Sequence, residues 1–389
     1  MYLETHEKLA RFVNQNTGTP VLAIDTEFLR EKTYYPKLCL LQLATEKRCV
    51  VVDPLVINDL SPLVTLFSDV RTTKVFHAGE QDCAIIHNRF GLVPTPLFDT
   101  QKAASILGFS QQVGLASIVS RYCGVTLAKH GTFSDWQRRP LTPKQVAYAL
   151  DDVRYLPRIY RAMTEELEQS GRALWLSDEF ARLADAATYA VDPDESWRKV
   201  KGSSVLPARQ LSLLQPLAAW RERTAQGRNC PRRWFLTDEQ LVEISRHDPE
   251  TVEALFEIRG IREKLGLKGA TAVVELLAAA REAPQGEQPR RERRPIKTSD
   301  QVASLDLMTA LVHLRAAENR ISSSMLTNHD ELVRIASGER EDVALLSGWR
   351  REIVGAEIID LLEGRIVLHL KDGELKVTAI ARLAEGGFS

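Results

Sequence analysis

The sequence of 389 residues predicts an α/β domain with a mixed sheet at residues 1–195, followed by two all-helical domains at 205–285 and 300–389. Three observations lead to this prediction. Short apolar runs alternate with helix-like segments in the first half of the chain, as expected for strands and helices of one α/β domain. Beyond about residue 190 the strand-like runs stop and amphipathic helical segments take over. The polar, basic and Pro-rich segment 286–299 divides the helical part and is typical of a linker.

Composition limits the classes of protein to consider. Hydrophobic residues make up 44% of the chain and charged residues 26%, which fits a globular protein with buried cores. The net charge of −1 provides no overall attraction to nucleic acid or membrane, so any such attraction must come from a local patch such as the basic linker. The five cysteines are scattered, without a Cys-x-x-Cys pair, which argues against a disulfide framework and a structural zinc site.

The sequence gives no reason to expect a membrane partner. Its N-terminus lacks the basic and then apolar regions of a secretion signal. No stretch is long and apolar enough to cross a bilayer. We therefore expect a cytoplasmic protein, and a monomer.

The first domain is expected to contain four strands and a possible fifth. Val21–Ile24, Leu38–Ala44 and Cys49–Val52 are apolar runs separated by turns, and they predict a three-stranded antiparallel meander. Val75–His77 is expected to be a fourth short strand, and Leu97–Asp99 could be a fifth.

Helices are expected between and after these strands. A short helix is predicted within residues 1–19, and another over Gln81–Asn88. A third begins at Thr142, because Thr142, Pro143 and Gln145 have the spacing of a capping box with proline at the first helical position. Pro157 should kink or restart this helix.

The two helical domains resemble one another, so we expect an internal repeat of roughly 80 residues. Each has a long Leu-rich first helix, a polar loop and a helix containing Leu-Val-x-Ile, at Leu241–Ile244 and Leu332–Ile335. The end of the chain departs from the repeat. Ile366–Lys371 and Glu374–Ala379 flank Asp372-Gly373, which predicts a two-residue hairpin.

Two carboxylates follow the first predicted strand. Asp25 and Glu27 are two residues apart, so on an extended chain they point to the same side. Two anions held so close repel one another unless a cation lies between them. Such a pair is more often a solvated loop start, and a metal role requires further carboxylates nearby.

Two more acids and a tyrosine complete a candidate site. Asp82 follows the fourth strand and a short turn, and Asp152 lies one helical turn after Tyr148. Singly, each of these acids would be expected on the surface. Together with Asp25 and Glu27 they could hold two hard divalent ions, which can clamp the attacking and leaving oxygens of a phosphodiester.

These residues resemble the motifs of the DEDD exonucleases, in the subgroup with tyrosine in its third motif. Neighbouring segments, among them Thr33–Leu38, Leu40–Leu43 and Ser134–Trp136, are similar to the ribonuclease D branch of that family. The helical domains resemble HRDC domains, which that branch carries in tandem. The resemblance covers nearly the whole chain and implies a ribonuclease H-like exonuclease domain.

The resemblance also implies roles for individual residues. Asp25 would bridge two ions, Mg²⁺ or Mn²⁺, with Glu27 and Asp152 completing one ion site and Asp82 holding the other ion. Tyr148 would orient the attacking water, because a free phenol with a pKa near 10 is a poor base at neutral pH. Contacts with substrate could come from four further residues, for which core packing or structural hydrogen bonds are the alternative: Phe28, Leu29, His77 and Tyr34.

The implied activity is that of a metal-dependent 3′–5′ exoribonuclease acting on RNA. Its expected substrates are the 3′ ends of tRNA precursors and other structured RNAs, and its products nucleoside 5′-monophosphates. Two alternatives stay open from the residues alone. One is a 3′–5′ exonuclease directed at DNA, since no residue in the sequence indicates a contact with the 2′-OH that distinguishes RNA from DNA. The other is a non-catalytic nucleic-acid-binding protein with a degenerate nuclease domain.

Overall fold

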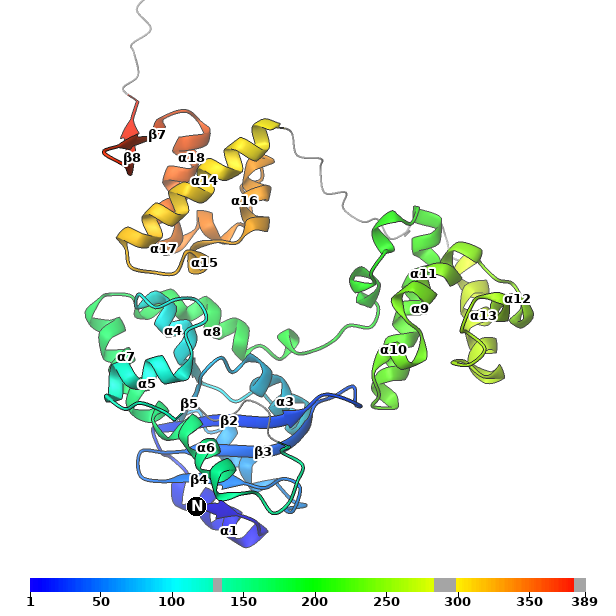
Figure 1. The fold of residues 1–389 in the computed structure, drawn as a ribbon, viewed down its shortest axis with the longest axis horizontal. Helices are drawn as coiled ribbons and strands as arrows, with labels where there is room; N and C mark the ends of the chain where they lie inside the picture. The colour runs from blue at the N-terminus through cyan, green and yellow to red at the C-terminus, as the bar shows by residue number, and fades with distance from the viewer. Residues whose placement is uncertain (129–134, 283–298, 381–389) are drawn as a thin grey trace, which may run out of the picture.

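The computed structural model describes residues 1–128, 135–282 and 299–380. The first domain is built on a six-stranded mixed sheet with the strand order β1-β4-β3-β2-β5-β6 (Figure 1). The central strands β2 and β3 are antiparallel, whereas β5 runs parallel to β2 and β6 parallel to β5. The strands are β1 (Tyr2–Leu3), β2 (Val21–Leu29), β3 (Lys37–Ala44), β4 (Cys49–Val52), β5 (Thr73–Phe76) and β6 (Leu97–Asp99).

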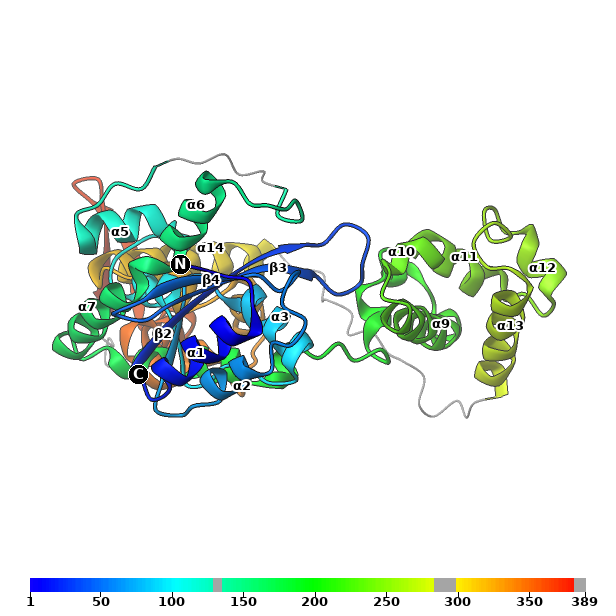
Figure 2. The same cartoon turned by 90° about the horizontal axis from the view of Figure 1, so that it is seen from below.

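Helices cover both faces of this sheet. Helices α1 (His6–Asn16), α2 (Pro62–Phe67) and α3 (Glu80–Phe90) pack their apolar sides on one face. The opposite face is covered by α4 (Thr100–Ile106), α5 (Leu115–Cys123), α6 (Pro143–Arg154) and α7 (Leu156–Gln169). Figure 2 shows α1 and α2 on one side of the strands and α6 on the other.

The predicted mixed-sheet α/β domain is confirmed, with two differences in its strands. Strand β2 does not end at Ile24 but continues to Leu29, because it pairs with β3 as far as Leu29 and Lys37. The pairing shifts by one residue between Glu27 and Phe28, where Cys39 is the extra residue of β3. Strand β1 was not expected, because its residues Tyr2 and Leu3 pair with Val51 and Val52 of β4, which are distant from them in the sequence.

Helix α6 begins as its sequence predicts. The side chain of Thr142 accepts a hydrogen bond from the backbone of Gln145, and the Gln145 side chain accepts one from the backbone of Thr142. This reciprocal cap satisfies backbone donors that would otherwise lack partners. The helix restarts at Leu156, with Pro157 in the first turn of α7.

The first helical block contacts the α/β domain through the connection between β2 and β3. Its helices are α9 (Ala208–Gly227), α10 (Arg232–Phe235), α11 (Asp238–His247), α12 (Val252–Glu257) and α13 (Leu267–Glu282). The hydroxyl of Tyr34 donates to Glu222 of α9 at 2.5 Å, and the backbone N–H of Tyr35 donates to Asn229 at 3.0 Å. This contact holds the block beside the C-terminal end of β2 (Figure 1).

The second helical block lies against a different part of the first domain (Figure 1). It contains α14 (Ser299–Glu318), α15 (Ser323–Leu326), α16 (His329–Ala336), α17 (Gly348–Arg350) and α18 (Ala356–Leu362). The rings of Trp349 and Trp175 stack in parallel with their centroids 4.4 Å apart. Arg172 donates to the carbonyl of Asn319 at 2.8 Å, and Ser322 donates to the carbonyl of Ser105 at 2.8 Å.

The two blocks share an element order. In each, a long helix and a one-turn helix precede a capped helix that carries Leu-Val-x-Ile, with Thr237 and Asn328 as the N-caps. The chain then forms the expected hairpin, β7 (Ile366–Lys371) with β8 (Glu374–Ala379), in which Asp372 and Gly373 both have positive φ. The proposed linker 286–299 lies outside the described residues except for its last one. Among the described residues, no helix is long and apolar enough to cross a membrane.

Candidate active site

Three of the predicted carboxylates meet over the second half of β2, beyond the residues Val21–Ala23 that pair with β5. Asp25 and Glu27 lie on the face of β2 that α6 covers, and Asp152 comes from α6 itself. One oxygen of each lies within 4.8 Å of the others, and all three residues are partly exposed. Carboxylate oxygens at this spacing are the donor set that hard divalent cations prefer.

Asp82 reaches the same region from the other face of the sheet. The turn before α3 holds Ala78 at a φ of 60°, and a Cβ on Gly79 would lie 2.3 Å from the Cβ of Phe76. This tight turn starts α3 above the end of β5, so Asp82 is buried against Thr26, whose hydroxyl donates to its carboxylate. Asp82 is therefore close to the site but is not one of the three carboxylates that lie within 4.8 Å of one another.

The pKa values of all four carboxyl groups are raised. Burial is the largest cause in every case, and the neighbouring acids add to it: the pKa of Asp25 lies well above its usual value, and that of Glu27 rises to about 8. Burial and the charge of Asp151 raise the pKa of Asp152 to about 7. Burial raises the pKa of Asp82 to about 6, although hydrogen bonds from Thr26 oppose the shift. Four acidic groups are thus crowded here, and no cationic side chain is among the causes of these pKa shifts.

Tyr148 lies beside the carboxylates on α6. Burial and the charges of Asp152, Glu27 and Asp25 raise its pKa above the ordinary phenol value. The hydroxyl is therefore protonated at neutral pH and can donate a hydrogen bond. Its ring packs against Trp136 at 6.1 Å between centroids.

The segment that leads into α6 is anchored to the sheet. The guanidinium of Arg139 donates to Asp53 at 2.5 and 2.8 Å and to the carbonyl of Cys39 at 2.8 Å. Asp53 is fully buried at the end of β4. These bonds hold the start of α6, and hence Tyr148 and Asp152, at a fixed place over the strands.

The four predicted substrate-contacting residues are in different environments. Both ring nitrogens of His77 lie near protein atoms, at 2.9 Å from Thr100 and 3.1 Å from the carbonyl of Val113, and burial lowers its pKa. Leu29 packs against the core under α6. Tyr34 bonds to the first helical block, as described above. Phe28 and Tyr34 both line a cavity, so substrate contact stays a prediction for these two residues.

That cavity, of about 680 Å³, lies where β2, α3 and the first helical block meet. Phe28 and Gln81, the neighbours of Glu27 and Asp82 in the chain, line it from the first domain. Among the other lining residues are six aromatic or cationic ones, namely Tyr34, Tyr35, Tyr189, Arg30, Arg232 and Arg233, beside apolar residues and the acidic Glu31. Such a mixture suits a phosphodiester strand with stacked bases.

Two residues near the carboxylates were not singled out from the sequence. Thr26 lies between Asp25 and Glu27 and faces the other side of the sheet, where its hydroxyl donates to Asp82. Gln42 lies opposite Asp25 on β3 and is fully buried. Its signal in the sequence is a polar side chain in the otherwise apolar run Leu38–Ala44.

Comparisons with known proteins identify the families to which parts of this chain are similar. The sequence model of the 3′–5′ exonuclease family matches residues 1–168, and that of the HRDC domain matches 210–266. Ribonuclease D of Sphingobium indicum is 41% identical over 375 residues, covering 95% of this chain and 96% of the relative. Ribonuclease D of Acidiphilium cryptum is 38% identical over 379 residues, with 96% of each protein covered.

A solved structure is similar over the same length. The crystal structure of Escherichia coli RNase D, described as an exoribonuclease involved in structured RNA processing, has a TM-score of 0.80 and 31% sequence identity. The match covers 94% of this chain and 98% of that one. The first helical block is thus similar to an HRDC domain, whereas a second HRDC domain at 300–389 stays a prediction.

Proposed function

The chain belongs to the ribonuclease D family and is a 3′–5′ exoribonuclease, and we propose that it trims the 3′ ends of tRNA precursors and other structured RNAs. The products would be nucleoside 5′-monophosphates. The observation that supports hydrolysis at this place most strongly is the meeting of Asp25, Glu27 and Asp152 oxygens within 4.8 Å. A monomeric state and a cytoplasmic location stay predictions.

Enzymes of this exonuclease class depend on divalent metal ions, and the acidic cluster fits such ions. The raised pKa values of Asp25 and Glu27 support the fit, because a bound cation would relieve the repulsion that raises them. We propose that Asp25, Glu27, Asp82 and Asp152 hold two ions, Mg²⁺ or Mn²⁺. When bound, the ions would supply acidification of the attacking water and charge compensation for the departing 3′ oxygen.

Tyr148 is proposed to position the attacking water by hydrogen bonding. The phenol keeps its proton at neutral pH, since its pKa is raised, so it acts as a donor and not as a base. Its ring is held against Trp136 and its hydroxyl beside Asp152. The chain therefore presents the hydroxyl in a restricted place next to the carboxylates.

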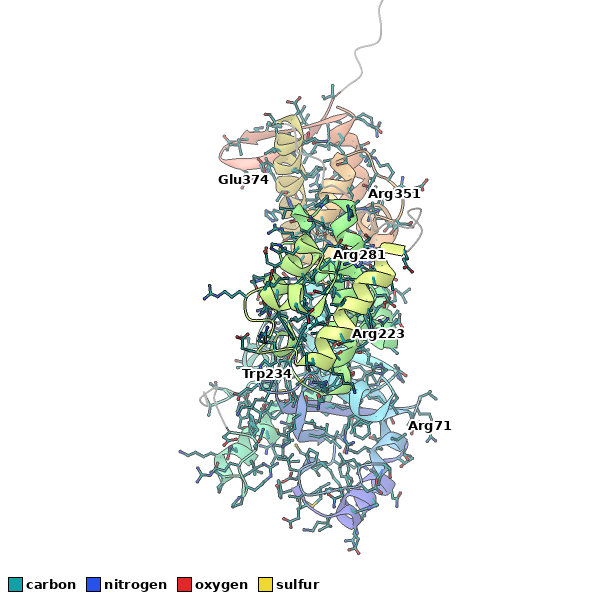
Figure 3. The ribbon with its side chains drawn as sticks, turned by 90° about the vertical axis from the view of Figure 1, so that its right-hand side faces the viewer. Arg71, Arg223, Trp234, Arg281, Arg351 and Glu374 are labelled. Carbon is teal, nitrogen blue, oxygen red and sulfur yellow. The ribbon has the colours of Figure 1, made fainter. Side chains whose placement is uncertain are left out.

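The RNA strand 5′ to the cleaved bond is proposed to pass along the cavity lined by Phe28, Arg232 and Arg233. Trp234, which is 57% exposed on the adjoining helix α10, extends the aromatic and cationic surface (Figure 3). Arg233→Ala should weaken RNA binding and lower the slope of log affinity against log salt by about 0.7. Arg71→Ala is the matched control, since the Arg71 side chain is 68% exposed against 62% for Arg233, lies on another part of the surface and pairs with Asp69 (Figure 3).

The central test replaces one metal ligand. Asp25→Asn should lower cleavage of a 3′-extended tRNA precursor by about 10³-fold or more while leaving RNA affinity within a few fold. Asp59→Asn, at an exposed carboxylate that lies beside His6 and outside the acidic cluster, should change neither cleavage nor RNA affinity. Cleavage by Asp25→Asn at the wild-type rate would refute the assignment of the site. Products other than 5′-mononucleotides would refute the proposed reaction.

A further inference from the structure

Gln42 stands out because it is a fully buried amide within an apolar strand. Its side chain is 0% exposed, and the flanking residues on β3, Leu41 and Leu43, are also fully buried. Within the described residues, no partner lies within hydrogen-bonding distance of either its amide nitrogen or its amide oxygen. A buried amide without a partner is destabilising, so a leucine in its place would suit the metal-free fold better.

The sheet register decides what Gln42 can reach. Gln42 pairs directly with Asp25 on β2 and with Val51 on β4, so its side chain lies on the same face as theirs. Residues two positions away along β3, Leu40 and Ala44, are apolar. Asp25 is therefore the one polar side chain directly across from Gln42 on this face.

Helix α6 closes the remaining side. It packs over β2, β3 and β4, and its buried residues Ala149 and Val153 offer no polar side chain. The polar side chains that α6 brings to this face are Tyr148 and Asp152, both beside Asp25. Directly opposed side chains have Cβ atoms about 5 Å apart, which a glutamine side chain can span.

We propose that Gln42 is a positioning residue for Asp25: the two side chains face each other without a hydrogen bond in this structure, and when Asp25 is ionised as a metal ligand the NH₂ of Gln42 donates to its carboxylate and fixes its orientation. The inference rests on the proposed role of Asp25 as a ligand. The amide acts only through Asp25 and touches neither substrate nor cation. Loss of a side chain that hydrogen-bonds to a metal ligand typically lowers metal affinity or activity 10- to 100-fold.

The test compares Gln42→Leu with the wild-type protein by isothermal titration calorimetry with Mn²⁺ and without RNA, together with thermal melting of the metal-free proteins. We expect the dissociation constant for Mn²⁺ to rise about 10-fold or more, while the melting temperature of the metal-free variant stays equal or increases. Gln42→Met keeps the length of the side chain without its donor and should behave in the same way, which covers the case in which the leucine variant folds poorly.

The control is Val51→Ala, at the other cross-strand neighbour of Gln42. It leaves a cavity on the same face, so it should lower the melting temperature without changing Mn²⁺ affinity. Wild-type Mn²⁺ affinity in both Gln42 variants would overturn the inference. A loss of Mn²⁺ affinity in Val51→Ala as large as in the Gln42 variants would also overturn it, because lost packing alone would then explain the effect. Asp25→Asn tests the proposed metal site independently of the role of Gln42. Unchanged Mn²⁺ binding in this variant would contradict the metal site, whatever the Gln42 variants show.

Discussion

Replacing Asp152 by asparagine should raise the melting temperature of the metal-free protein at alkaline pH, although it removes a proposed metal ligand. The pKa of Asp152 is raised from 3.8 to about 7, chiefly by burial and then by the charge of Asp151. The folded protein therefore keeps a proton that the unfolded chain has released, and its stability falls as the pH rises from about 4 to about 7. Asparagine carries no charge at any of these pH values.

The size of the effect follows from the pKa difference. About three units at about 1.4 kcal/mol each set an upper limit of about 4 kcal/mol. Because Asp152 is only partly buried and titrates together with its neighbours, we expect about half of that, roughly 2 kcal/mol. This corresponds to a rise of about 4–8 °C in the melting temperature of a domain of this size.

The assay is differential scanning calorimetry of chelator-treated protein near pH 8.5 and near pH 4. The gain should be present at the higher pH and absent at the lower one. Asp151→Asn is the matched control, because it removes the adjacent carboxylate together with an ion pair to Arg154 and should give little gain. A melting temperature at or below that of the wild type near pH 8.5 would refute the electrostatic reasoning, as would an equal gain at both pH values.

Three further predictions concern the hydroxyl at the site and the two helical blocks. Tyr148→Phe should lower the single-turnover cleavage rate about 10- to 100-fold and leave the shape of its pH profile unchanged, since the phenol is a donor; loss of a titration step would show instead that it is a base. Tyr34→Phe removes a hydrogen bond to the buried Glu222, so the free energy that holds the first block in place should fall by about 1–3 kcal/mol. Hydrogen exchange should show this as reduced protection of α9. Unchanged protection would contradict a stabilising role for this contact. Trp349→Ala removes the ring stacked on Trp175, so the second block should separate from the first domain. Small-angle scattering should then show a larger radius of gyration, while cleavage of a short oligonucleotide stays at the wild-type rate. A wild-type radius of gyration would show that the other contacts hold the second block in place without the stacked rings.

Local signals in the sequence predicted the features that depend on neighbouring residues. The cap at Thr142 and Gln145 and the hairpin turn at Asp372-Gly373 are examples, because both are set by residues within a few positions of one another. The length of β2 was not predicted in the same way. Its polar residues after Ile24 stay in the strand since β3 continues to pair with them, and no local pattern encodes that pairing.

The sequence named the candidate acids but not their arrangement, and their roles stay predictions. The motif spacing named Asp25, Glu27, Asp82 and Asp152, yet it could not show that Asp82 approaches from the opposite face and bonds to Thr26. Partners far apart in the chain decide such details. Arg139, for instance, meets Asp53 across 86 positions.

The most direct measurement is a crystal soaked in Mn²⁺ and examined by anomalous scattering. Our account predicts two peaks, both ligated by Asp25, with Glu27 and Asp152 on one ion and Asp82 on the other. A single ion, or manganese bound away from these carboxylates, would contradict the two-ion scheme.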